Sequence, residues 1–197
     1  MLPLSVAQFL LPPSLPEGSG EQVVLDVIDA QTREAIVNAT LVLEVGEGGA
    51  KKSYMLYTGE EGKVSLVMPA ENVAVVGKIN DPASEGSDYV SYSMELQGAG
   101  GELLMWPSGS VRGVVRAASG ELVPDATVGA SCASDYGEKS ARSDEAGAFQ
   151  LQYLPVGNCK ITAAKDAAVG SASVVVEKGR MGSASLQLGE KVLAQGS

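Results

Sequence analysis

Hydrophobic positions along the chain alternate with polar ones in short runs that are separated by turn residues. No stretch keeps apolar side chains at helical spacing for three turns, and Val, Ala, Ser and Thr occur along the whole length. This alternation is typical of strands with one face in a core, and it predicts an all-β protein. Strands are expected at residues 23–28, 40–45, 53–57, 63–68, 73–79, 89–96, 103–106, 111–117, 127–132, 139–142, 149–153, 159–164, 171–176 and 183–188.

The two halves of the chain resemble each other at a nearly constant offset. The matched positions are separated by 87, 85 and 86 residues, and a repeat of this length indicates tandem structural units. Short strands that recur about every 8 to 12 residues predict two tandem immunoglobulin-like β-sandwiches. The matched pairs are Ala39 with Ala126, Gly62 with Gly147, and Pro69 with Pro155.

These observations predict three segments. Residues 1–20 form an N-terminal extension, residues 21–107 the first sandwich, and residues 108–191 the second. A short joint is expected at Pro107–Gly109, where a stiff proline precedes a flexible glycine.

Composition narrows the classes of function. The 197-residue chain has a formal net charge of −10 and a pI near 4.5. An acidic surface repels phosphate backbones, so nucleic acid is not expected as a partner. No run of about 18 apolar residues occurs, so no membrane-spanning helix is expected.

The chain contains two cysteines and no His. His is the commonest general base and metal ligand, and two cysteines cannot form a four-thiolate zinc site. We therefore expect no catalytic residues, no metal site and no cofactor. Cys132 and Cys159 leave two alternatives open, a disulfide in an oxidising compartment or two buried free thiols.

Four segments of the second half follow a known pattern: Gly113–Val115, Gly120–Val128, Ser143–Phe149 and Leu154–Ile161. With them the second half resembles the carboxypeptidase regulatory-like domain. The resemblance implies a transthyretin-like (prealbumin-like) sandwich of seven strands over most of residues 110–189, and the sequence repeat extends this expectation to a second copy. Such modules serve as spacers or binding units, so the resemblance implies a fold and leaves the function open.

The sequence departs from this family at one informative position. Cys159 stands where the family usually has an aromatic residue after the Leu-Pro-x-Gly turn. Alternation from Ala126 places Cys132 on the same inward face. Both sulfur atoms would then point into one core, which favours the disulfide.

Several residues of the first half are candidates for binding. Tyr54, Tyr57 and Trp106, with two further tyrosines, are a weak candidate for a glycan-stacking platform, although burial of the rings or packing within a hairpin explains them better. Asn38 begins a glycosylation sequon, Asn-Ala-Thr. The acidic loop that contains Asp81 fits no calcium-binding motif and is expected to be solvated.

The N-terminal extension is apolar and uncharged over its first eleven residues, eight of which are hydrophobic. An apolar segment of this kind folds back on its own domain, is a remnant of a hydrophobic leader, or donates a strand to a neighbouring subunit. The donor-strand candidates are Leu2, Leu4, Val6, Phe9 and Leu10.

Together these features favour a non-catalytic structural or adhesive protein that is extracellular or on the cell surface. The leading hypothesis is a surface filament (pilus-like) subunit that self-associates, or binds another surface protein, through its N-terminal strand. The alternative is a carbohydrate- or protein-binding accessory module of a secreted or surface hydrolase.

Overall fold

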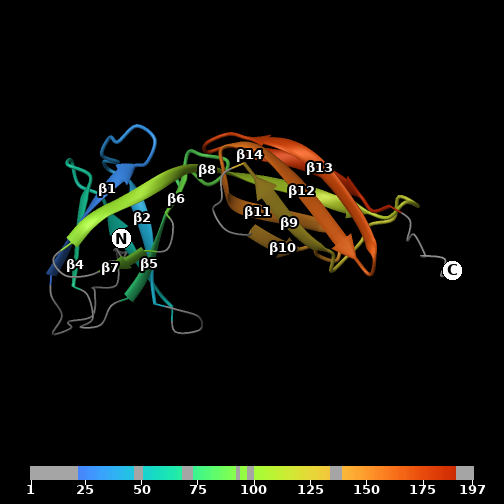
Figure 1. Ribbon diagram of the computed structural model, residues 1–197, viewed down its shortest axis with the longest axis horizontal. Helices are drawn as coiled ribbons and strands as arrows, with labels where there is room; N and C mark the ends of the chain where they lie inside the picture. Colours follow the sequence, from blue (N-terminus) through green and yellow to red (C-terminus); the bar gives the residue numbers. More distant parts are fainter. Residues whose placement is uncertain are drawn as a thin grey trace, which may run out of the picture.

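The computed structural model describes residues 22–46, 51–67, 73–91, 94–96, 100–133 and 139–189. All regular elements in these ranges are strands, so the predicted all-β sandwich fold is confirmed (Figure 1). The donor-strand candidates between Leu2 and Leu10 lie outside the described residues. The strands are β1 (Gln22–Asp29), β2 (Thr40–Val45), β3 (Lys52–Tyr57), β4 (Lys63–Val67), β5 (Val73–Ile79), β6 (Tyr89–Ser91), β7 (Met94–Leu96), β8 (Gly100–Arg116), β9 (Thr127–Cys132), β10 (Lys139–Arg142), β11 (Ala148–Pro155), β12 (Gly157–Lys165), β13 (Ala168–Val176) and β14 (Met181–Gln187).

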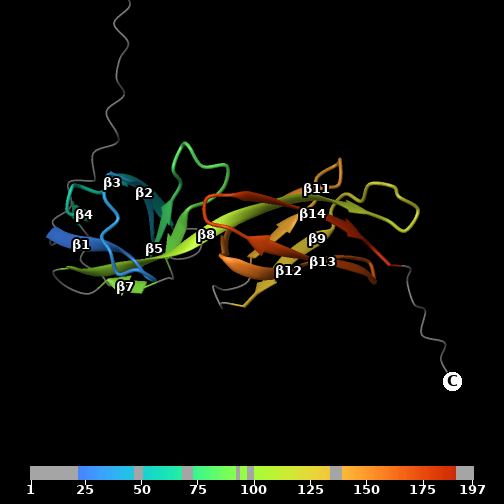
Figure 2. The same ribbon diagram turned by 90° about the horizontal axis from the view of Figure 1, so that it is seen from above.

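Two separate hydrophobic cores divide the strands into two units. Unit 1 contains β1 to β7 and residues 100–107 of β8, and unit 2 contains the remainder of β8 and β9 to β14. The units lie one after the other along the long axis of the molecule, with β8 running through both (Figures 1 and 2).

Unit 1 is built around alternating strands. In β1, Val23, Leu25 and Val27 are buried, and in β2 Leu41 and Leu43 are fully buried, because successive side chains of a strand point to opposite faces. The strand order β3-β2-β5-β6-β8-β1-β4 wraps these inward faces around one core. The first half of β8 pairs in parallel with β1 and antiparallel with β6, which joins the two walls of the sandwich.

Unit 2 is a sandwich of two sheets. One sheet has the order β11-β8-β14 and the other has the order β10-β9-β12-β13. Its core contains the fully buried Val111, Val115, Ile161 and Leu186. Phe149 fills the space beside Gly113, where an added Cβ would lie 2.7 Å from the phenylalanine ring.

Matched positions of the sequence repeat make equivalent hydrogen bonds in the two units. The Ala39 amide donates to the Thr58 hydroxyl oxygen (2.9 Å), and the Ala126 amide donates to the Ser143 hydroxyl oxygen (2.8 Å). The carbonyl oxygens of Gly62 and Gly147, both glycines with positive φ, each accept a 2.8 Å bond from the neighbouring core strand. The same turn chemistry therefore closes the same corner of each unit, while a common family for both units stays a prediction.

The joint between the units differs from the sequence-based expectation. The strands expected at residues 103–106 and 111–117 are one continuous strand, β8, and the expected stiff-then-flexible joint at Pro107–Gly109 lies inside it. Ser108 and Pro155 are paired across this point, so β11 of unit 2 supports the backbone where a hinge was expected. The expectation of a flexible joint at Gly109 was wrong. Gly109 is needed there because another backbone segment packs closely against it, as described below. The boundaries of the three predicted segments stay a prediction.

Candidate functional site: the inter-unit junction

The connection between β5 and β6 reaches from unit 1 onto unit 2. Near its end, the buried Ser87 makes several hydrogen bonds across the junction. The Ser87 amide donates to the Ser110 hydroxyl oxygen (3.0 Å), and the Ser87 hydroxyl donates to the Gly109 carbonyl (2.8 Å). The same hydroxyl oxygen accepts a hydrogen bond from the Tyr153 amide (2.8 Å). Because buried polar groups without partners are costly, this satisfied set fixes one arrangement of the two units.

Glycines allow the backbones of the two units to approach closely. The Gly86 amide donates to the Gly179 carbonyl (3.1 Å), and the Gly179 amide donates to the Ser108 carbonyl (3.0 Å). A Cβ added to Gly86 would lie 2.5 Å from the Arg180 carbonyl oxygen, and one added to Gly109 would lie 2.2 Å from the Glu177 carbonyl oxygen. These two positions therefore require glycine for packing, which is the reason Gly109 is not a hinge.

A chain of three polar side chains closes the junction on one side. Lys178 of unit 2 donates to the Tyr89 hydroxyl, which donates to Asp29 Oδ2 (2.8 Å). The Lys178 ammonium also lies 3.9 Å from the centroid of the Tyr89 ring. Asp29 and Tyr89 belong to unit 1. The chain therefore links the Lys178 ammonium of unit 2, through the Tyr89 hydroxyl, to the Asp29 carboxylate of unit 1.

The surroundings shift the pKa values of this chain. Burial alone would raise the pKa of Asp29, but hydrogen bonds from the Thr32 amide, the Tyr89 hydroxyl and the Gln31 amide, with the charge of Lys178, bring it below its ordinary value. Burial and the neighbouring Asp29 raise the pKa of Tyr89. At neutral pH the junction therefore holds an aspartate anion and a neutral tyrosine.

The opposite side of the junction is also polar. Asn80 donates to the Tyr153 hydroxyl (3.0 Å), and the Lys78 ammonium lies 5.3 Å from the Tyr153 ring centroid while pairing with Glu44 (2.5 Å). Burial, followed by the charge of Lys78, lowers the pKa of Lys139 in unit 2. Side chains from both units thus flank β8 on two sides.

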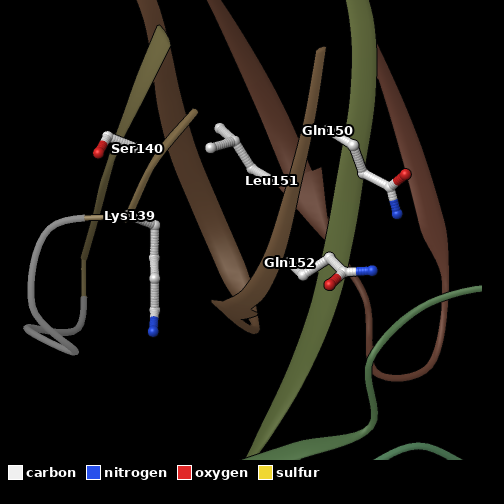
Figure 3. A pocket seen from close by; sticks show the side chains of 5 residues that line it. All are labelled: Lys139, Ser140, Gln150, Leu151 and Gln152. Carbon is white, nitrogen blue, oxygen red and sulfur yellow. The ribbon is translucent and has the colours of Figure 1, made fainter. Parts of the chain in front are cut away.

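Two hollows of the described surface are lined in part by polar side chains. A cleft of about 300 Å³ beside the junction is lined by Asn38, Asp81 and Lys178, among others. A groove of about 500 Å³ between β10 and β11 is lined by Lys139, Ser140, Leu151 and two glutamines (Figure 3). Lys139 and Ser140 are consecutive residues of β10, so their side chains point to opposite faces of the strand.

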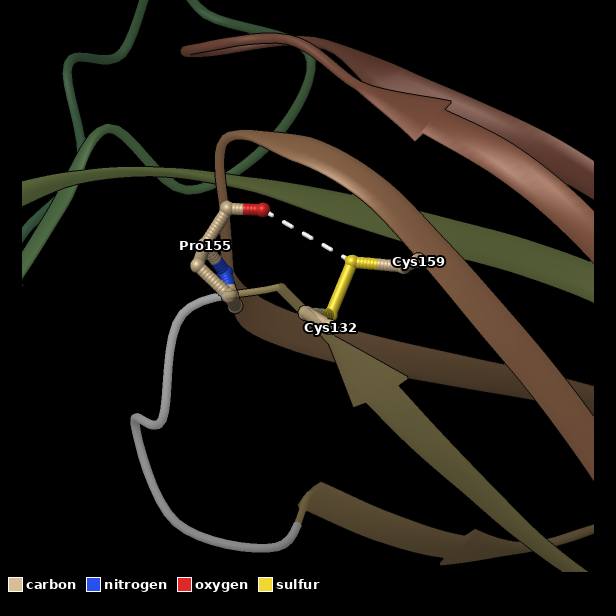
Figure 4. Close-up of a disulfide and its surroundings, with 3 residues drawn as sticks. All are labelled: Cys132, Pro155 and Cys159. Atoms are coloured by element: carbon tan, nitrogen blue, oxygen red, sulfur yellow. Dashed lines mark hydrogen bonds between the residues drawn. A yellow bond between two sulfur atoms is a disulfide. The ribbon is translucent and has the colours of Figure 1, made fainter.

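The two cysteines form the disulfide that the sequence favoured. Cys132 of β9 and Cys159 of β12 are directly paired across the sheet, and Cys159 is buried in the core of unit 2 (Figure 4). Cys159 Sγ lies 3.8 Å from the Pro155 carbonyl oxygen. Both described cysteines are therefore oxidised, and the alternative of two free thiols is wrong.

The aromatic residues proposed as a glycan platform are not brought together. Tyr54 and Tyr57 lie on opposite faces of β3, because Tyr54 packs against the core while Tyr57 is 62% exposed. Trp106 is half-buried on β8, four strands away from β3 in the sheet order. These three residues therefore cannot form one continuous stacking surface.

The remaining predicted residues have plain structural settings. Asn38 is exposed, with a φ of 53°, at the end of the β1–β2 connection. The acidic loop is not simply solvated, because the buried Asp88 accepts hydrogen bonds from the Asp81 amide (2.6 Å) and the Ser84 hydroxyl (2.8 Å). Across the described ranges, no cluster of three or more acidic or cysteine side chains is placed to hold a metal ion.

Sequence reasoning missed the residues that form the junction. Ser87, Gly86 and Lys178 were not singled out, because each becomes meaningful only when the two units meet. The available signal was the length of the polar segment after β5, which is unusual for a connection between neighbouring antiparallel strands. Among the residues that the structure covers, no helix is long and apolar enough to span a membrane.

Several solved structures are similar to this chain at low identity. The Bacillus anthracis TIE protein is 18% identical with a TM-score of 0.36, and the match covers 85% of this chain and 33% of that one. The minor pilin GBS52 of Streptococcus agalactiae is 9% identical with a TM-score of 0.39, covering 90% and 99% of the two chains. The shaft pilin SpaA of Lactobacillus rhamnosus GG is 12% identical with a TM-score of 0.35, covering 88% and 99%. TM-scores this low support no assignment of function.

A search of curated proteins gives no match. The protein-family comparison matches residues 110–189 to the Carboxypeptidase regulatory-like domain. The match starts within β8 and ends just after β14, so it coincides with the sandwich of unit 2. A carboxypeptidase regulatory-like domain is therefore found at residues 110–189 of this chain.

Proposed function

We propose that this chain is a non-catalytic structural segment of an extracellular or cell-surface protein, in which two sandwiches form one rigid rod. The observation that carries the proposal is the shared strand β8, which is paired with β1 and β6 in unit 1 and with β11 and β14 in unit 2. A linker between independent domains would instead be exposed and unpaired.

The junction supports the same function. A flexible two-domain protein needs few contacts between its domains, whereas here Ser87 and Gly86 are bonded directly to unit 2. These contacts use close-packed backbone and satisfied buried hydroxyl groups, which tolerate little displacement. The disulfide between Cys132 and Cys159 is consistent with an oxidising compartment outside the cytoplasm.

The rod also suits end-to-end self-association into a surface filament. Gln22 is at the free end of unit 1, because its neighbour Val24 pairs with Gly100 at the start of β8. The last described residue, Gly189, is at the opposite end of the molecule, beyond β14 (Figure 2). The apolar residues 1–11 precede Gln22 in the sequence, and binding of these residues to the far end of a neighbouring copy would join rods end to end.

The alternative function as a glycan-binding accessory module gains no support from a specific contact. It required aromatic rings on one surface, and Tyr54 and Tyr57 lie on opposite faces of their strand.

Insertion of Gly-Gly between Pro107 and Ser108 tests the rigid rod. We expect the insertion to break the register of β8, to split one cooperative unfolding transition into two, and to broaden the distribution of inter-unit angles in small-angle scattering. The matched control is the same insertion between the exposed Glu60 and Glu61, at the turn before β4. Equal scattering profiles for the two insertions would show that β8 does not set the rigidity.

Self-association is tested on the full wild-type chain. We expect sedimentation velocity to show mass that increases with concentration, and electron microscopy to show rods joined at their ends. A monomer at every concentration up to the millimolar range would contradict the filament part of the proposal. The rigid-rod part would still be tested by the Gly-Gly insertion.

A further inference from the structure

The connection after the first strand of each unit forms a corner. In unit 1 this corner contacts unit 2, and unit 2 has an equivalent corner at its free end. In unit 1 the Ile36 amide donates to the Val27 carbonyl (2.9 Å), and in unit 2 the Val123 amide donates to the Val115 carbonyl (2.9 Å). The β1–β2 and β8–β9 connections therefore occupy equivalent positions. In unit 1 this corner lies against Lys178 of the neighbouring unit, whereas in unit 2 no neighbouring unit is present among the described residues.

The two corners differ in the length of one connection. Between β5 and β6, residues 80–88 reach across the junction, but between β12 and β13 only Asp166 and Ala167 form the turn. The corner of unit 2 contains a hollow of about 330 Å³ that no residue of a second unit lines. Its lining is mainly apolar, with Ala117, Ala118, Val123, Ala168 and Leu188, and it also includes Ser119, Lys165 and Asp166.

The chemistry of the open corner is also different. The Asp29 amide in unit 1 donates to the Glu34 carbonyl, and the equivalent bond in unit 2 runs from Ala117 to the Glu121 carbonyl. A methyl group thus stands where unit 1 has the Asp29 carboxylate, which accepts a hydrogen bond from the Tyr89 hydroxyl that Lys178 binds. The open corner therefore suits an apolar, uncharged occupant and not a lysine-bearing loop.

The chain contains such a segment at its other end. Residues 1–11 carry no charge and eight hydrophobic side chains, and they precede Gln22 at the free end of unit 1. Strand β8 alone spans roughly 50 Å between the two ends of the rod. Leu10 is joined to Gln22 by at most about 40 Å of extended chain, so Phe9 and Leu10 cannot reach the hollow of their own copy.

We infer that Phe9 and Leu10 of one copy occupy the hollow at the free end of unit 2 of the next copy. This inference rests on the proposed self-association and names its acceptor site. The contact joins two different surfaces at opposite ends of the rod, so successive copies add end to end into a chain of rods.

The first test compares two glutamate substitutions in the full chain. Ala118→Glu places a carboxylate at an exposed position in the hollow, whereas Val175→Glu places one on the outer face of β13 near the junction, where Val175 is 63% exposed. We expect Ala118→Glu to weaken self-association by about ten-fold or more and Val175→Glu to change it less than about two-fold, measured by sedimentation velocity. Equal effects of the two changes would overturn the inference.

The second test mixes two defective copies. Phe9→Asp disables the segment and leaves the hollow intact, and Ala118→Glu does the reverse. Each variant alone is expected to be monomeric, and their mixture is expected to form dimers that do not extend further. Long assemblies, or monomers only, in the mixture would contradict the assignment of segment and hollow.

A third test separates this inference from the proposed filament. A fluorescent peptide of residues 1–13 should bind the full-length Phe9→Asp protein and lose about ten-fold in affinity when Ala118→Glu is added. Peptide binding of this kind with a monomeric wild type would support the acceptor site and reject the filament. Assembly of the wild type without such peptide binding would support the filament and reject the acceptor site.

Discussion

At the scale of single residues, the junction distinguishes two serines on the same strand. Ser108 and Ser110 are both fully buried in β8. The Ser110 hydroxyl oxygen accepts the Ser87 amide, whereas the Ser108 hydroxyl has no hydrogen-bond partner among the described residues. A buried hydroxyl without a partner keeps its desolvation cost, so the two serines are expected to make opposite contributions to stability.

Ser110→Ala and Ser108→Ala form a matched pair of variants. We expect Ser110→Ala to lower the free energy of unfolding by about 1–3 kcal/mol, because it leaves the buried Ser87 amide unpaired. Ser108→Ala should leave the free energy unchanged or raise it, since it removes an unpaired group at nearly constant volume. Urea unfolding measures both, and a larger loss from Ser108→Ala would show that its hydroxyl has a partner.

Asp29 gives the junction a pH dependence. Its pKa in the folded protein lies below the ordinary value of 3.8, so its contribution to stability is present above about pH 4 and is lost as the pH falls through the folded-state pKa. Tyr89→Phe removes the hydroxyl that donates to Asp29, and we expect it to reduce both the stability at pH 7 and the acid sensitivity.

Chemical unfolding of Tyr89→Phe between pH 2 and pH 7 checks this expectation. Tyr57→Phe is the control, because the Tyr57 hydroxyl is exposed and contacts only the Met55 sulfur (3.9 Å) among the described residues. A difference between wild type and Tyr89→Phe that stays constant over the whole pH range would contradict a role for the Asp29 bond.

At the scale of elements, the disulfide joins two strands that already pair. Cys132 and Cys159 enclose a separation of 27 residues, which includes all of β10 and β11. The bridge restricts the unfolded chain over that span and fills part of the core where the family usually has an aromatic ring. Its stabilising effect is therefore expected in unit 2.

Reduction of the disulfide tests that contribution. For a loop of this length the loss in free energy of unfolding is expected to be about 3.5 kcal/mol. Thermal unfolding with and without a reductant measures it, and a double variant Cys132→Ala and Cys159→Ala should show no further response to the reductant. A reductant effect of equal size in that double variant would assign the loss to something other than this bridge.

Element by element, periodicity predicted the fold well where strands alternate cleanly. The bounds of β2, β5, β9 and β10 agree with the sequence-based expectation, because turn-forming residues flank each of them in the sequence. Periodicity could not predict β8, since Pro107 and Gly109 inside it are ordinary turn residues and their pairing partners are distant in sequence.

At the scale of the whole molecule, sequence patterns described each unit better than the contact between units. Repeat matching found positions that close equivalent corners, such as Ala39 and Ala126, because their hydrogen bonds are local. The junction depends on the difference between the copies, namely the longer connection that carries Ser87 in unit 1. Repeat matching detects similarity between the two halves and therefore does not detect this longer connection. The longer connection nevertheless determines how the units are joined.

The parallel pairing of β8 has a mechanical consequence. When the two ends of the rod are pulled apart, β1 is drawn away from unit 2 while β8 is held by it, so their hydrogen bonds from Val24 to Asp29 are loaded in shear. The pairing of β14 with β8 is loaded in the same way at the other end. Hydrogen bonds loaded in shear share the tension instead of opening one after another. Between the units, the tension passes through the covalent backbone of β8. The fold is therefore arranged to resist stretching along its long axis, which is the load that a tethered surface protein experiences.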